Sequence, residues 1–283
     1  MADVKQVSDA KCFGGQQRVY EHDSKELGCK MKFAVFLPSV AVQSDATKLP
    51  VVYYLSGLTC TEQNMITKSG FQKYAEQYKL IVVCPDTSPR GCNVPGEDAG
   101  WDIGTGAGFY VDATQEPWKK NYRMYSYVTS ELRQVVEANF KQVDSSRVGI
   151  TGHSMGGHGA LVAFFRNPTV YKCATAFAPI SNPINSQWGV KCLTAYLGED
   201  KESWKEYDAT ELVKKQPRKD AKILVDQGGK DEWMSYLVPN NFVEACKQAG
   251  QPLEYNERDG YDHGYYFIST FMENHMKHLA ANL

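Results

Sequence analysis

Six short apolar runs recur along the chain, and long amphipathic stretches separate them. The runs cover residues 33–37, 51–55, 80–84, 148–151, 174–179 and 223–226. Their richness in Val, Ile and aromatic side chains is typical of strands that are buried on both faces of a mostly parallel sheet. Because parallel neighbours are joined by long crossovers, the pattern predicts an α/β architecture with helices on both faces.

The stretches between the runs contain the helix candidates. Amphipathic spacing predicts helices over residues 70–78, 122–139, 240–248 and 265–279. Residues 86–118 form instead a long segment rich in Gly and Pro, and a loop of that length inside a compact chain is usually functional. No repeat, low-complexity tract or linker divides the sequence, so we predict one domain over residues 1–283.

Residues 152–156, Gly-His-Ser-Met-Gly, match the G-x-S-x-G pattern of a nucleophile elbow. An apolar run precedes the pattern, and the small residues of 157–161 follow it. A sharp turn from strand to helix needs small neighbours, because the serine backbone is strained and lies close to adjacent chain. A glycine-rich turn with an incidental serine is the alternative. The strand before and the helix after favour Ser154 as the nucleophile of an α/β-hydrolase fold.

A serine hydroxyl needs a general base before it can act as a nucleophile. In this fold the triad runs in the order Ser, acid, His, which leaves three histidines late in the chain. His275 and His278 lie in the predicted C-terminal helix, where we expect them to face solvent. His263 lies in the loop before that helix and is the predicted base. A loop histidine that bonds only to backbone is the alternative for this position.

The acid should follow a late strand, and residues 223–232 are typical of such a strand and its exit loop. Asp231 is the predicted acid because it lies beyond the glycines of that loop. Asp226 is the alternative, and it could instead bond to loop amides. Asp262 is adjacent to the histidine in sequence, so its side chain is expected to point away.

Two backbone amides are expected to stabilise the oxyanion of an acyl-transfer reaction. One belongs to Met155, which follows the nucleophile, and the other to Leu58, in the loop after an early strand. An ordinary turn would look the same, because only main chain is needed there. The segment 101–110, rich in Gly and aromatic residues, is a candidate wall for an acyl pocket. No phosphate-loop pattern occurs, so we predict no cofactor.

Composition excludes several classes of function. The formal net charge is -2, so no basic field indicates nucleic acid or a membrane surface as a partner. No apolar run approaches the roughly 18 residues that span a bilayer, and residues 1–15 lack the apolar centre of a signal peptide. The eight cysteines form no CxxC pair. We therefore predict no metal site, no disulfide framework and a cytoplasmic location.

Several longer segments resemble the S-formylglutathione hydrolase family, also called esterase D. They are residues 11–15, 56–64, 85–91, 104–110, 152–159 and 260–263. The resemblance therefore runs nearly end to end. Many hydrolases share the elbow, whereas the second, third and fourth of these segments are much more specific. The run 227–233, just before and after the predicted acid, departs from the family's usual sequence.

The resemblance implies a cytosolic enzyme, usually a homodimer without a cofactor, that hydrolyses S-formylglutathione to glutathione and formate during formaldehyde removal. It also implies turnover of simple aryl and alkyl esters, and it carries the triad onto Ser154, Asp231 and His263. A cysteine at the position of Cys60 implies sensitivity to thiol reagents, and we expect proximity to the site without a chemical role. A general carboxylesterase, an acyltransferase on the same fold and an inactive binding protein are the alternatives.

Overall fold

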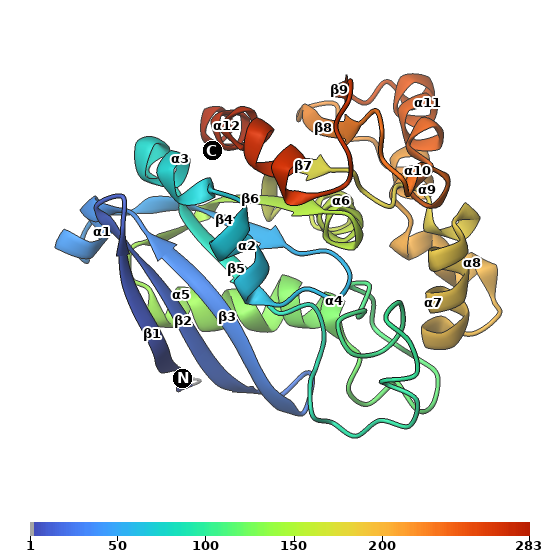
Figure 1. The fold of residues 1–283 in the computed structure, drawn as a ribbon, viewed down its shortest axis with the longest axis horizontal. Helices are drawn as coiled ribbons and strands as arrows, with labels where there is room; N and C mark the ends of the chain where they lie inside the picture. The colour runs from blue at the N-terminus through green and yellow to red at the C-terminus, as the bar shows by residue number, and fades with distance from the viewer. Residues whose placement is uncertain (1–2) are drawn as a thin grey trace.

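One nine-stranded sheet runs through residues 3–283, the part of the chain that this computed structural model describes. Met1 and Ala2, the first two residues of the predicted domain, lie outside the described residues. The strands are β1 (Lys5–Cys12), β2 (Gly15–Ser24), β3 (Cys29–Leu37), β4 (Leu49–Leu55), β5 (Ile81–Pro85), β6 (Val143–His153), β7 (Tyr171–Phe177), β8 (Ile223–Gly228) and β9 (Leu253–Arg258). Their spatial order is β1-β2-β3-β5-β4-β6-β7-β8-β9 (Figure 1).

The register of the sheet brings the ends of its central strands together. From β5 through β4 to β9 all neighbours are parallel, whereas β1, β2 and β3 add an antiparallel extension that joins at β5. Leu55 pairs with Gly152, Gly152 with Ala176, and Ala176 with Val225. The carboxyl ends of β4, β6, β7 and β8 therefore lie at one edge, and the loops that follow them leave the sheet side by side.

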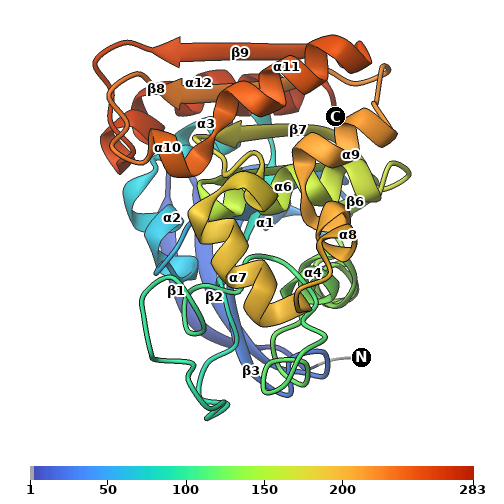
Figure 2. The same ribbon diagram turned by 90° about the vertical axis from the view of Figure 1, so that its right-hand side faces the viewer.

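Helices cover both faces of this sheet. They are α1 (Ser39–Gln43), α2 (Glu62–Lys68), α3 (Phe71–Tyr78), α4 (Met124–Ser126), α5 (Leu132–Asn139), α6 (Met155–Arg166), α7 (Gln187–Leu197), α8 (Lys201–Trp204), α9 (Ala209–Lys215), α10 (Met234–Leu237), α11 (Pro239–Ala249) and α12 (Tyr265–Ala281). A π-helical turn, Tyr127–Glu131, links α4 to α5, and 3₁₀ turns occupy Pro183–Asn185 and Lys205–Tyr207. Helix α12 packs against α3, β7 and β8, while α11 packs against α9, and Figure 2 shows α12 and α11 on opposite sides of β8.

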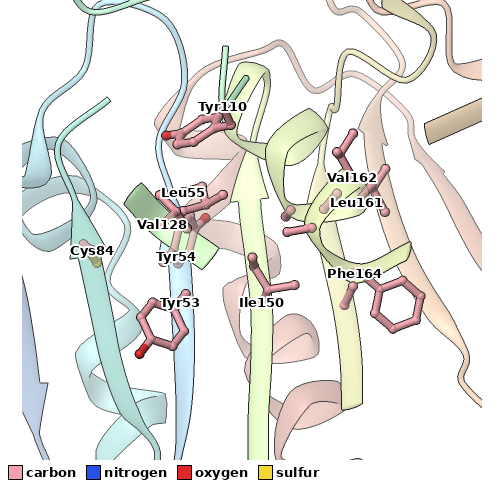
Figure 3. Close-up of a cluster of buried hydrophobic side chains, with 14 of the residues drawn as sticks. Tyr53, Tyr54, Leu55, Cys84, Tyr110, Val128, Ile150, Leu161, Val162 and Phe164 are labelled. Atoms are coloured by element: carbon pink, nitrogen blue, oxygen red, sulfur yellow. The ribbon is translucent and has the colours of Figure 1, made fainter. Parts of the chain in front are cut away.

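Part of the hydrophobic core lies between β4, β6 and α6. Tyr53, Tyr54 and Leu55 of β4 and Ile150 of β6 are at most 1% exposed, and side chains of α6 lie beside them (Figure 3). Every residue of α6 except Arg166 is buried, which explains why this helix is apolar all round. Helix α6 lies between the sheet and α9. Its first turn, which follows the elbow directly, is thereby fixed in place.

All six predicted strands are present, as β3 to β8, and the predicted mostly parallel α/β-hydrolase fold is confirmed. The four predicted helices correspond to α3, the α4 to α5 segment, α11 and α12. Residues 86–118 carry neither helix nor strand, as predicted. The sequence did not predict β1, β2 and β9, since these strands lack the continuous apolar runs of the central strands.

Two further properties concern residues 3–283 only. None of the helices there combines the length and the apolar character needed to cross a membrane. Within the same residues no group of three or more His, Cys, Asp or Glu side chains is arranged to hold a metal ion.

Candidate active site

Ser154 lies in the sharp turn between β6 and α6. Its φ is 58° and its ψ is -118°, a conformation that costs energy for any residue with a side chain. The two glycines of the motif make this turn possible. A Cβ at Gly152 would lie 2.2 Å from the carbonyl oxygen of Gly156, and one at Gly156 would lie 2.0 Å from that of Leu55. The structure therefore has the backbone geometry of a nucleophile elbow.

His263 and Asp231 lie in hydrogen-bond contact at the same edge of the sheet. Nδ1 of His263 is 2.7 Å from Oδ2 of Asp231, whose side chain is completely buried. Asp231 also accepts hydrogen bonds from Gln227 Nε2 at 2.8 Å and from the amide of Trp233 at 2.8 Å. Because the carboxylate accepts the proton of Nδ1, the Nε2 atom of His263 is the nitrogen that can accept a proton from a serine.

A cavity of about 140 Å³ brings the predicted residues together. It is lined by Gly57, Leu58, Thr59, Cys60, Trp101, His153, Ser154, Trp188, Trp233 and His263. A Cβ at Gly57 would lie 3.2 Å from Cβ of Ser154, so the loop that contains Leu58 passes directly beside the serine. Within residues 3–283, the amides of Leu58 and Met155 donate to no acceptor. Both amides are therefore available to a developing negative charge.

His153 lines this cavity too, although the sequence indicated no role for it. Its ring centroid is 4.5 Å from that of His263. Burial holds the pKa of His153 well below its ordinary value, and the nearby His263 lowers this pKa further. His153 is therefore neutral at neutral pH and adds no positive charge beside the base.

Asp226, the alternative acid, belongs to a different cluster. It is fully buried and accepts hydrogen bonds from Arg258 Nε at 3.0 Å, Arg258 Nη2 at 3.1 Å and Asn256 Nδ2 at 2.9 Å. Burial alone would raise the pKa of Asp226, but His275, Asn256 and Arg258 together lower it. Asp262 is not among the residues that line the cavity, and its Oδ1 accepts a hydrogen bond from the amide of Gly264 at 2.9 Å.

The prediction that His275 and His278 face solvent is wrong for His275. That side chain is fully buried, its ring stacks on Phe177 with centroids 3.5 Å apart, and its Nε2 lies 3.6 Å from Asp226 Oδ2. His278 is half-buried and contacts the carbonyl of Lys222 at 2.9 Å. The physical reason is the helical period, because Met272, Met276 and Leu279 place His275 on the buried face of α12.

Three tryptophans form the apolar wall of the cavity. Trp101 is 51% exposed, and its ring lies 5.6 Å from that of Trp188 and 6.0 Å from that of Trp233. The predicted wall was residues 101–110, but only Trp101 of this segment lines the cavity. Phe109 and Tyr110 belong instead to the buried hydrophobic core. No sequence pattern indicated Trp188, whereas the position of Trp233, two residues after Asp231, could have indicated a role for Trp233.

Cys60 is also a cavity residue, and it is only 8% exposed. Its Sγ lies 3.6 Å from the hydroxyl of Tyr265. Burial raises the pKa of the Cys60 thiol, which lowers the fraction of reactive thiolate at neutral pH. The predicted proximity of Cys60 to the site agrees with this placement.

A parallel sheet with a serine at the turn after β6, and a histidine and an acid on later loops, defines a hydrolase of the α/β-hydrolase class. Residues 24–278 match the Esterase family model. The chain is 56% identical to the S-formylglutathione hydrolase of Bos taurus over 282 residues, which cover 99% of each chain. It is 50% identical to that of Arabidopsis thaliana over 281 residues, which cover 99% of this chain and 98% of the relative.

A solved structure leads to the same family. The S-formylglutathione hydrolase of Agrobacterium tumefaciens superposes with a TM-score of 0.93 at 46% identity, over 98% of this chain and 99% of that one. These matches extend over almost the whole chain. The chain therefore belongs to the S-formylglutathione hydrolase family of esterases.

Proposed function

We propose that this protein hydrolyses S-formylglutathione to glutathione and formate, and so acts in formaldehyde removal. One observation carries the proposal: the hydrogen bond of 2.7 Å between His263 and Asp231, at a cavity that Ser154 also lines. A serine, a histidine and a buried carboxylate in this relation form the machinery of acyl transfer through a serine. The full-length identity to relatives of that name selects the thioester among possible substrates.

In the first step, His263 Nε2 takes the hydroxyl proton of Ser154 as its oxygen attacks the thioester carbonyl. Negative charge develops on the carbonyl oxygen, which the amides of Leu58 and Met155 stabilise. Asp231 stabilises the imidazolium that forms. The carbon–sulfur bond then breaks, His263 returns the proton to the leaving sulfur, and glutathione departs from a formyl-serine.

In the second step, water replaces glutathione. His263 takes one proton from the water while the water oxygen attacks the formyl-serine carbonyl. The amides of Leu58 and Met155 again stabilise the negative charge on the carbonyl oxygen. The bond to Ser154 breaks, the serine oxygen regains its proton from His263, and formate leaves. The cavity measures about 140 Å³ and has a wall of three tryptophans, which favours a small acyl group over a bulky one.

We also propose a cytoplasmic homodimer that uses neither a cofactor nor a metal. All eight cysteines are free thiols, a state that a reducing compartment maintains. Both steps above are complete with side chains and main-chain amides of this chain. Size-exclusion chromatography with light scattering measures the oligomeric state directly, and a monomer at micromolar concentration would contradict this part of the proposal.

The test compares S-formylglutathione with its S-acetyl and S-lactoyl analogues. We expect the formyl thioester to have the highest kcat/KM, and preference for a larger acyl group would refute the substrate assignment.

Ser154→Ala should lower kcat by about 10⁶-fold, by analogy with subtilisin, and should abolish labelling by a fluorophosphonate. Ser186→Ala, at another buried serine, is the matched control and should keep both the wild-type kcat and the labelling by a fluorophosphonate. Added alcohols test the acyltransferase alternative, which would yield esters in place of formate.

A further inference from the structure

The loop that carries the Leu58 amide is held by a second, distant segment of the chain. We call residues 56–60, between β4 and α2, the oxyanion loop. Residues 86–110 form the clamp segment, which contains no regular secondary structure. The clamp segment includes stretches that make the family resemblance specific, yet none of the steps above gives them a chemical role. Their contacts with the oxyanion loop supply one.

The clamp segment contacts the beginning and the middle of the oxyanion loop. The hydroxyl of Tyr110 donates a hydrogen bond of 2.9 Å to the carbonyl of Ser56. The amide of Thr59 donates one of 2.9 Å to the carbonyl of Gly106. A Cβ at Gly106 would lie 3.0 Å from Cα of Thr59, so the two backbones approach as closely as a glycine permits.

The end of the oxyanion loop is held by side chains. The carbonyl of Cys60 accepts hydrogen bonds from Thr87 Oγ1 and, at 3.2 Å, from Arg90 Nη2. Asp86 orients the guanidinium, since its carboxylate accepts hydrogen bonds from Arg90 Nε at 2.7 Å and from Arg90 Nη2 at 3.0 Å. Thr87 is fully buried, and Asp86 is 5% exposed.

These contacts determine where the Leu58 amide points. The carbonyl of Gly57 accepts the amide of Cys60 at 3.3 Å, so this turn and the clamp contacts leave the amide of Leu58 as the free donor. Thr59 has a φ of 66°. A β-branched residue is strained in that conformation and keeps it only when its surroundings enforce it. Without the clamp, Thr59 would relax and rotate the neighbouring peptide groups.

We propose that Arg90 is a positioning residue for the Leu58 amide and acts through the carbonyl of Cys60, together with Thr87. The proposal rests on the proposed function, in which that amide receives the oxyanion. Negative charge on the carbonyl oxygen develops only towards the transition state. A misplaced donor therefore lowers kcat and leaves KM nearly unchanged.

The chain contains a closely matched control for Arg90→Ala. Arg147 Nε contacts Asp144 at 2.7 Å, and its Nη2 donates to the carbonyl of Lys48 at 3.1 Å. The side chains of Arg90 and Arg147 are 36% and 39% exposed. Lys48 precedes β4, whereas the oxyanion loop follows it, so Arg147 makes the same kind of contacts at the opposite end of the strand.

We expect Arg90→Ala to lower kcat for p-nitrophenyl acetate by about 10- to 100-fold, with KM changed less than about twofold. Rates are expressed per active site titrated with a fluorophosphonate, so partial unfolding does not count as a loss of kcat. Arg147→Ala should change neither constant. An aryl trifluoromethyl ketone, which forms a tetrahedral oxyanion on the serine, should bind more weakly to Arg90→Ala by the same factor as kcat/KM falls.

Two further variants keep the proposal testable if Arg90→Ala does not fold. Thr87→Val removes the other donor to Cys60 without changing charge and should also lower kcat selectively. Arg90→Lys keeps one donor and should recover part of the loss. Equal kcat in wild type, Arg90→Lys and Thr87→Val, or a loss in KM alone, would overturn the proposal. Because the assay uses a simple ester, inability of the wild type to hydrolyse S-formylglutathione would refute the proposed substrate only.

Discussion

Asp226 on β8 and Asp231 on its exit loop are both buried carboxylates. Replacing Asp231 with Asn should lower activity, whereas replacing Asp226 with Asn should lower stability. At Asp231, three donors meet the two carboxylate oxygens: His263 Nδ1, Gln227 Nε2 and the amide of Trp233. An asparagine has one oxygen, so its NH₂ group must face at least one of these donors. If the NH₂ group faces Oδ2's partners, His263 and Gln227, the imidazole must turn or adopt the other tautomer, and its Nε2 can no longer accept the serine proton. If it faces the amide of Trp233 instead, the negative charge that stabilises the imidazolium is still lost. We expect kcat to fall by about 10³- to 10⁴-fold, as in the serine-protease case.

Asp226→Asn should instead lower stability. It removes the charge that compensates the guanidinium of Arg258, which contacts Asp226 at 2.9 Å and is 23% exposed. Breaking a fully buried pair costs about 3–5 kcal/mol, and the partial exposure of Arg258 reduces this to about 2–3 kcal/mol. For a chain of this size the loss corresponds to about 5 °C in Tm. Activity should stay within a few-fold of wild type, because Asp226 contacts neither His263 nor the cavity.

The assay measures kcat per titrated active site at pH 7, and Tm for both variants at pH 7 and at about pH 3, below the ordinary aspartate pKa of about 3.9. The folded pKa of Asp226 is lowered, so its charge stabilises the fold above the unfolded pKa, about 3.9. This contribution is lost as pH falls through the folded value, so the difference in Tm should narrow at the lower pH. A larger loss of kcat in Asp226→Asn than in Asp231→Asn would refute the assignment of the acid.

Two more outcomes follow from buried groups. Cys60→Ser should stay active and resist inactivation by N-ethylmaleimide. Cys92→Ser, which changes a half-buried thiol outside the cavity, should remain sensitive to this reagent. Equal inactivation of both variants would show that Cys60 is a bystander. Burial lowers the pKa of His158 to about 4, so acid unfolding must charge it. The contribution of neutral His158 to the free energy of unfolding is complete above pH 6.5 and falls by about 3 kcal/mol towards pH 4. Urea unfolding of His158→Gln should therefore show a shallower loss of stability between these pH values, and an unchanged slope would contradict this account.

The parts of the site that sequence could predict are those encoded locally. The elbow needs glycines on both sides of Ser154, a strand before it and a helix after it, and all of these lie within about twenty residues. His263 could be selected because the fold fixes the chain order of the triad. In the sequence, its place beyond the glycines favours Asp231 over Asp226. The distinction in the structure is different, since Arg258 and Asn256 already occupy the oxygens of Asp226.

The parts that sequence could not predict depend on long-range contacts. Trp101, Trp188 and Trp233 come from three segments, and only the folded chain shows that they form one wall. The contact between Arg90 and the carbonyl of Cys60 likewise joins two loops that follow different strands. The error at His275 had another cause. Histidine is a residue type that usually faces solvent, but the helical period of the apolar residues around it in α12 places His275 on the buried face.

Backbone strain links these local and distant features. Nine non-glycine residues within 3–283 have a positive φ, and six of them lie on loops at the carboxyl edge of the sheet or in the clamp segment. They are Thr59, Asn93, Phe109, Tyr110, Ser154 and Ala178. Conformations of this kind cost about 1–3 kcal/mol each and persist only where surrounding contacts enforce them. The rigid layer of β4, β6 and α6 enforces the turn at Ser154, whereas hydrogen bonds from Tyr110, Thr87 and Arg90 enforce the turn at Thr59. Tyr110 also packs against Gly159 of α6 and so touches both supports. Thr87 and Arg90 contact the oxyanion loop alone among these elements, so a substitution at either one can impair the oxyanion amide while the nucleophile stays in place.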